Sequence, residues 1–184
     1  MPDNSINWGS VADWVSGLGS LSAGVIALYL ARSNTRIRLT GYCGLRLVIG
    51  GGMPQVDLVS ISVTNVGTRA TVINNIGISV GRFKGKRHGI ITAMKDTYSV
   101  GIPYPLADGQ QAHWGIPMGK DKQWLRELCG KFIKTEQDVQ TFRFHVYTNH
   151  GTKLTLKPEE AMLKAMREVL AEAHAGPAAA TQAA

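Results

Sequence analysis

The sequence predicts a mainly β protein in which a β-sandwich of about seven strands lies between one N-terminal transmembrane helix and a C-terminal α-helix. Two observations predict this fold class. The stretch from Trp14 to Ala31 carries no charge. Beyond it, short runs of alternating apolar and polar residues are separated by Gly, Asn and Pro turns, without the spacing of strand–helix–strand units. The expected parts are a segment outside the membrane (1–13), the transmembrane helix (14–31), the β-sandwich (32–157), the C-terminal helix (158–175) and a disordered tail (176–184).

The uncharged stretch from Trp14 to Ala31 is long enough to cross a membrane. A helix rises about 1.5 Å per residue, so a hydrocarbon core of about 30 Å takes about 20 residues. Extending the stretch back to Trp8 adds only one charge, Asp13. The alternatives are a buried core helix and a helix lying in the membrane interface. The sharp step in charge after Ala31 disfavours the first, and the lack of Lys or Arg on the stretch disfavours the second.

The basic residues around the helix predict its orientation. No Lys or Arg precedes position 32, and the first arginines follow soon after it, without an intervening acid: Arg32, Arg36, Arg38 and Arg46. The positive-inside rule therefore places the N-terminus outside and residues 32–184 in the cytoplasm. The acidic start lacks the positive segment of a secretory signal, so we do not expect it to be cleaved.

Small residues on the helix suggest how it meets other helices in the membrane. Gly19 with Ala23, and Ser20 with Gly24, form pairs of small residues four positions apart. Such faces let two helices approach closely in lipid. Small residues are also common in membrane helices that do not associate, so a homo-oligomer and a monomer both stay open.

The chain is basic, with a formal net charge of +7. The charge favours anionic partners such as phospholipid headgroups, nucleic acid or acidic protein faces, although a domain beside an anionic membrane leaflet can be basic for solubility alone. The densest basic segment is 82–95, where Arg82, Lys84, Lys86 and Arg87 are the candidate contacts to an anionic ligand or to lipid. A solvated loop, a lipid contact and a nucleotide contact are all compatible with it, and we do not expect nucleic acid as a partner.

No motif in the sequence predicts catalysis, and we expect neither a cofactor nor a metal. The five histidines do not pair at metal-ligand spacing with one another or with the two cysteines. The sequence has neither a nucleophile elbow nor a phosphate-binding loop of the P-loop type. By strand alternation His145 points outward, and His150 lies in a turn, so both are expected at the surface. Trp124, Leu128 and Phe132 recur at helical spacing and predict a short helix packed on the sheet.

Three stretches resemble a group of small bacterial and prophage-encoded proteins of unknown function. They are VSISVTNVGTRATVINNIGISVG (59–81), PYPLADGQQ (103–111) and FHVYTNHGTKLTLKP (144–158). In that group a similar core follows an N-terminal membrane helix. The resemblance covers most of residues 8–158 and implies a membrane-anchored, immunoglobulin-like sandwich without catalytic residues. Ala70 stands where the group has a proline, which leaves the fold expectation unchanged.

These observations give two main functional hypotheses, beside a third in which the chain is a soluble nucleic-acid-binding domain and the apolar N-terminal stretch does not span a membrane. The first is a single-pass protein of the bacterial inner membrane whose cytoplasmic sandwich is a non-enzymatic binding or regulatory module, with an association to phage, prophage or defence suggested by the resemblance alone. The protein partner of such a module is not indicated by the sequence. The alternative is an oligomeric membrane effector in which the basic cytoplasmic domain senses an anionic ligand such as a nucleotide.

Overall fold

The computed structural model describes residues 11–50, 55–82, 85–92 and 95–175. Two compact units make up the chain, Met1–Arg36 and Ile37–Ala184. The boundary lies a few residues after the expected end of the membrane helix at Ala31, at the short polar joint that precedes the first strand. Each unit is a structure in its own right and is described by itself.

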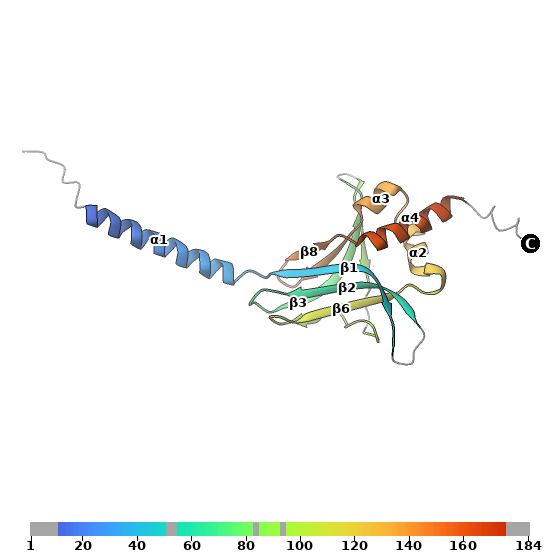
Figure 1. The fold of residues 1–184 in the computed structure, drawn as a ribbon, viewed down its shortest axis with the longest axis horizontal. Coiled ribbons are helices and arrows are strands. Elements are labelled where there is room, and N and C mark those ends of the chain that lie inside the picture. The colour runs from blue at the N-terminus through green and yellow to red at the C-terminus, as the bar shows by residue number, and fades with distance from the viewer. Residues whose placement is uncertain (1–10, 51–54, 83–84, 93–94, 176–184) are drawn as a thin grey trace, which may run out of the picture. The chain divides into compact units, whose positions relative to one another are not determined.

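The first unit contains a single long helix, α1 (Val11–Asn34), shown in blue in Figure 1. It extends beyond the expected 14–31 at both ends, with Asp13 in the first turn and Arg32 in the last. These charges complement the helix dipole. Among the described residues, Val11–Ser33 is the one segment long and apolar enough to span a membrane, and none of it is buried within the chain. A signal sequence near the N-terminus would meet the same criteria of length and apolar composition.

The first sheet of the second unit has the strand order β1-β2-β6 and is antiparallel throughout. Its strands are β1 (Leu39–Val48), β2 (Val56–Asn65) and β6 (Gln111–Pro117). Alternate residues of β2 and β6, among them Val59, Ile61 and Trp114, are fully buried. The alternation in sequence therefore becomes an inner, apolar face of the sheet.

The second sheet has the order β4-β3-β7-β8, and it is also antiparallel. Its strands are β3 (Thr71–Val80), β4 (Arg87–Ile91), β7 (Arg143–Thr148) and β8 (Lys153–Leu156). A short strand, β5 (Tyr104–Leu106), pairs with the start of β3. The buried side chains of Phe144 and Val146 point to the inner face. The alternate residues of β7 therefore belong to the outer face.

Helices gather at one end of the two sheets, where α4 (Glu160–Ala175) packs against α2, α3 and β1 (Figure 1). Between β6 and β7 the chain forms a short turn, η2 (Lys120–Lys122), followed by α2 (Gln123–Lys131) and α3 (Glu136–Thr141). The inner faces of both sheets and the buried faces of α2 and α4 belong to one hydrophobic core.

The expectation of a mainly β fold is too narrow. Of the described residues, 36% lie in strands and 37% in helices. The difference arises because α1 is longer than expected and because the chain between β6 and β7 forms α3 as well as α2. The structure therefore contains an N-terminal apolar helix and two antiparallel sheets that share a core with helices.

Candidate functional site

A polar cleft of about 440 Å³ opens on the outer face of the second sheet. Its floor comes from β3, β7 and β8, and its walls come from the turn after β3 and from α3. The lining is polar or basic throughout: Ser79, Gly81, Arg82, Lys86, Gln137, Gln140, Thr141, Arg143, His145, Lys153 and Thr155. The volume lies in the range of sites for small molecules, about 300–1,000 Å³.

The floor of the cleft is a row of three hydrogen-bonded side chains on adjacent strands. The Nε2 atom of His145 lies 2.7 Å from the Ser79 hydroxyl oxygen, and its Nδ1 atom lies 3.1 Å from the Thr155 hydroxyl oxygen. His145 is only 2% exposed, so the expectation that it lies at the surface is wrong. Strand alternation places it correctly on the outer face, but the side chains of Ser79, Thr155, His88 and Tyr147 surround its ring there. His150, in contrast, is exposed as expected.

The environment of His145 holds its ring in the neutral form. Burial is the main cause that lowers the pKa of His145 to about 4, and electrostatic interactions with Lys153, Lys86, His88 and Arg143 add to it. The neutral ring donates one hydrogen bond and accepts the other. It therefore fixes the orientations of the hydroxyl groups of Ser79 and Thr155, one on each side.

Four cationic side chains surround this floor: Arg82, Lys86, Arg143 and Lys153. No Asp or Glu occurs among the described residues that line the cleft. The Nη1 atom of Arg143 donates to the backbone oxygens of Gln140, at 3.0 Å, and Phe142, at 2.6 Å, which holds the guanidinium in place. At about 4 Å, each unit charge interacts with an anion by about 4 kcal/mol at an effective dielectric constant of 20. The cleft is therefore a region of unbalanced positive charge.

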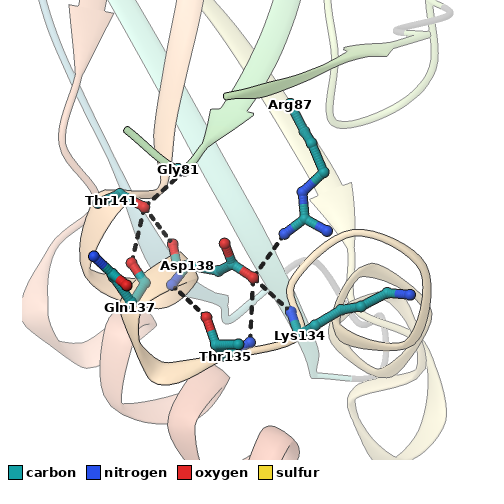
Figure 2. Close-up of polar contacts among 7 residues, drawn as sticks. All are labelled: Gly81, Arg87, Lys134, Thr135, Gln137, Asp138 and Thr141. Atoms are coloured by element: carbon teal, nitrogen blue, oxygen red, sulfur yellow. Dashed lines mark hydrogen bonds and ion pairs between the residues drawn. The ribbon is translucent and has the colours of Figure 1, made fainter. Parts of the chain in front are cut away.

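The carboxylate of Asp138 ties α3, which forms one wall of the cleft, to β4, the strand that follows the other wall (Figure 2). Its Oδ2 atom accepts hydrogen bonds from the backbone N–H groups of Lys134 and Thr135 at the start of α3, and Thr135 caps the helix in return. The same oxygen lies 2.7 Å from Nη2 of Arg87, on β4. A second tie runs from the backbone N–H of Gly81 to the Thr141 hydroxyl, at 2.8 Å.

The charge state of Asp138 follows from these contacts. Burial alone would raise the pKa of its carboxyl group, but the hydrogen bonds from the Lys134 backbone and the Arg87 guanidinium outweigh burial and lower the pKa below its usual value. Asp138 is therefore ionised at neutral pH, and its interaction with Arg87 is that of a charged pair.

The structure divides the basic residues that the sequence singled out. Arg82 and Lys86 line the cleft. Arg87 does not line it, because its guanidinium is paired with Asp138. Lys84 lies outside the described residues. Nothing in the sequence pattern singled out Arg143 and Lys153. They lie more than fifty residues further along the chain and reach the cleft only because β3 pairs with β7 and β7 pairs with β8.

The small residues that the sequence assigned to helix association, Gly19, Ser20, Ala23 and Gly24, lie exposed on α1. Among the described residues, and apart from the nearby backbone of α1 itself, no atom lies within 4 Å of the position that a side chain would take at Gly19 or Gly24. The structure contains one copy of the chain, so association through this face stays a prediction.

The residues of the cleft suit the binding of anions better than that of metal ions. Within the described ranges, no three or more His, Cys, Asp or Glu side chains come together as a metal site would need. Cationic groups and neutral hydroxyl and amide groups bind anions through charge-assisted hydrogen bonds. The chain matches no family model and no curated protein sequence. The chemistry of the cleft must therefore be argued from its own residues.

Proposed function

We propose that this protein is a single-pass, membrane-anchored binding module without catalytic activity, and that its basic cleft takes an anionic ligand. The observation that carries the proposal is the lining of the cleft. Four cations surround a hydrogen-bonded polar floor, with no acid among the described lining residues. Of the three interpretations of the basic segment, a contact with a discrete anion is the one this arrangement favours.

The strand order supports an immunoglobulin-like sandwich for the binding module. In that fold one sheet contains strands in the order A-B-E, the other contains C-F-G, and C′ pairs with C in the variable type. The order β1-β2-β6 corresponds to A-B-E, and β4-β3-β7-β8 corresponds to C′-C-F-G. Both cysteines, Cys43 and Cys129, are free and buried, so this version of the fold relies on packing rather than on a disulfide.

The floor of the cleft supports binding rather than nucleophilic catalysis. Ser79 and His145 have the separation of a nucleophile and its base. In catalytic triads a carboxylate on the far side of the ring stabilises the imidazolium. Here that position is taken by the neutral hydroxyl of Thr155, and cations lie nearby. A proton taken from Ser79 would therefore be poorly held. Phosphomonoester or carboxyl-ester turnover by the full-length protein that is lost in Ser79→Ala would contradict this argument.

The length and composition of α1 support a membrane anchor, and the arginines that follow it support an orientation with the N-terminus outside and the second unit in the cytoplasm. In a bacterium this membrane is the inner membrane. The proposal is tested by labelling intact cells with a membrane-impermeant maleimide, using the variants Ser5→Cys and Thr181→Cys of the full-length chain.

The unmodified chain is the matched control for this labelling. Burial raises the pKa of Cys43 to about 12 and that of Cys129 to about 11, so neither thiol presents a reactive thiolate. We expect labelling of Ser5→Cys alone. Labelling of Thr181→Cys alone would mean that the orientation is the opposite of the one proposed. Recovery of the chain in the soluble fraction after cell breakage would remove the anchor from the proposal.

The anion site is tested with the full-length protein in an uncharged detergent, by isothermal titration with inorganic pyrophosphate. We expect binding that weakens steeply with salt, since contacts with charged groups dominate the site. A hydrogen bond to a charged group contributes about 1.5–3 kcal/mol. Arg143→Gln should therefore weaken the binding of pyrophosphate by about 10- to 150-fold. Arg126→Gln removes the same charge from α2, outside the cleft, and should have no effect. Equal affinities of Arg143→Gln and Arg126→Gln for pyrophosphate would contradict an anion site in the cleft.

An oligomeric effector that senses the anion remains the second candidate. It is favoured because one chain combines a helix with exposed small residues, α1, and a candidate ligand site in its second unit. It predicts that the full-length protein in mild detergent is an oligomer and that Ala23→Leu dissociates it. Val25→Leu enlarges a side chain on the opposite face of α1 and is the matched control. A monomeric protein with and without pyrophosphate would exclude this candidate.

A further inference from the structure

Building on the anion site proposed above, we propose that the cleft binds a nucleoside diphosphate or triphosphate. The phosphates lie against Arg82, Lys86 and Arg143. The base lies on the ring of Tyr147, which stands beside the cleft on the same outer face of the sheet. Three observations carry this inference: the uneven placement of the cations, the ring row on the same face, and the size of the cleft.

The cations are concentrated at one end of the cleft. Arg143 pairs with Ser79, directly before the turn that carries Arg82 and Lys86, so these three lie at the same end of the strands. Lys153 pairs with Tyr147, two alternate positions further along β7. Alternate residues of a strand are about 6.5 Å apart, so the backbone of Lys153 lies about 13 Å from that of Arg143 along the strands, although the Lys153 side chain lines the same cleft. An extended ligand with its charge at one end matches this distribution better than a compact, uniformly charged anion.

A row of three rings crosses the outer face beside the cleft. The ring centroids of His88 and His145 are 6.4 Å apart, and those of His145 and Tyr147 are 6.1 Å apart. Tyr147 is half-buried because its ring passes over Gly77. A Cβ atom at that position would lie only 3.1 Å from the Cε2 atom of the tyrosine. The missing side chain at Gly77 therefore lets the ring approach the sheet and present a flat surface.

Flat aromatic surfaces next to cationic groups bind nucleobases by stacking while the cations hold the phosphates. The neutral groups between the two ends of the site are hydroxyls and amides, from Ser79, Thr155, Gln137 and Gln140. These groups donate and accept hydrogen bonds and suit the sugar of a nucleotide. The cleft of about 440 Å³ has room for the phosphates and the sugar, while the base lies beside it on Tyr147.

The test is isothermal titration of the full-length protein in phosphatidylcholine nanodiscs with ADP, GDP, CDP and UDP, and with pyrophosphate and adenosine. At least one nucleoside diphosphate should bind about tenfold more tightly than pyrophosphate, since stacking adds to the phosphate contacts. Adenosine should bind far more weakly than any nucleoside diphosphate. A cleft in which no nucleoside diphosphate binds more tightly than pyrophosphate overturns the inference but leaves the anion site intact. A protein that binds neither overturns both.

Variants separate the two ends of the site. Tyr147→Leu should weaken the preferred nucleotide about tenfold and leave pyrophosphate unchanged, whereas Tyr147→Phe should retain the affinity for both. Lys86→Gln, at an exposed position, should weaken both ligands, and Arg126→Gln should weaken neither. If Tyr147→Leu weakens both ligands equally, the ring does not contact the base and the inference fails.

A lipid headgroup offers the same phosphate chemistry from another source. The titrations are therefore repeated in nanodiscs that also contain phosphatidylglycerol, at constant ionic strength. Retention of the nucleotide affinity within about tenfold is the expected result, because a free nucleotide occupies the cleft. A loss of nucleotide affinity greater than about tenfold in the wild-type protein, but not in Lys86→Gln, would show that phosphatidylglycerol competes for the cleft. That result would assign the cleft to the lipid headgroup and overturn the inference.

Discussion

Lowering the pH from 7 to about 5 should remove about 2 kcal/mol from the free energy of unfolding through His145 alone. The pKa of this ring is about 4 in the folded protein, compared with an ordinary value of 6.5. Between these values the unfolded chain binds a proton that the folded chain does not bind, so protonation favours unfolding. Each unit of difference in pKa corresponds to about 1.4 kcal/mol, and about pH 5 lies partway through the window. The stability contribution is present above the ordinary pKa and is lost as the pH falls below it.

The assay is urea denaturation of the full-length protein in an uncharged detergent, followed by tryptophan fluorescence, at several pH values between 7 and about 5. His145→Gln keeps a side chain able to bond with Ser79 and Thr155 but cannot titrate, so its stability should change less with pH. Asp138 and Glu159 have lowered pKa values and lose their contributions mainly below this window, as the pH falls through the carboxyl range. Identical pH dependence in wild type and His145→Gln would refute the reasoning.

Three further predictions concern the rest of the second unit. Asp138→Ala should lower the free energy of unfolding by about 2 kcal/mol, because it leaves the backbone N–H groups of Lys134 and Thr135, just before α3, without their acceptor. Arg87→Gln should cost less than about 1 kcal/mol, because its guanidinium is half exposed. The midpoints of urea denaturation measure both. Ser60→Ala should be neutral or stabilising by up to about 1 kcal/mol, because the Ser60 hydroxyl is buried without a hydrogen-bond partner in the described structure. A loss of stability above about 1 kcal/mol would mean that this hydroxyl does have a hydrogen-bond partner. Cys43 and Cys129 should resist maleimide in the folded protein and react after unfolding, which mass spectrometry detects; labelling of either thiol under native conditions would contradict its burial.

Local signals predicted the parts of the fold that depend on neighbouring residues. The alternation from Val56 to Thr64 became β2, and the turn at Asn149–Gly151 joins β7 to β8. The helix expected from Pro158 starts at Glu160. In each case the residues that determine the element are adjacent in sequence, so periodicity and turn chemistry are sufficient to find them.

The helix α3 was not predicted, because its six residues are too few to show an amphipathic period. A signal was nevertheless present. Thr135 is followed three residues later by Asp138, and the two form a reciprocal capping pair. The spacing was that of a capping box, although Asp takes the place of the usual Glu or Gln. Without a hydrophobic run after it, this signal was too weak to stand alone.

The candidate site could be predicted only in part. Arg82 and Lys86 were identified because they lie in one dense basic segment. Arg143, His145 and Lys153 were not, since each stands in an ordinary strand pattern and acquires its role from a partner strand or from the walls of the cleft. Charge density along the chain cannot distinguish a cation that faces a cleft from one, such as Arg87, that is neutralised by a distant acid.

The carboxylate of Asp138 has a consequence for genetics. It touches no part of the lining, yet it joins the strand after one wall of the cleft to the helix that forms the other. The separation of the walls is thus fixed from behind. A screen for loss of the proposed anion binding should recover substitutions at Thr135 and Asp138 alongside those in the lining. Without the structure, such alleles would be misassigned to a second function or to misfolding.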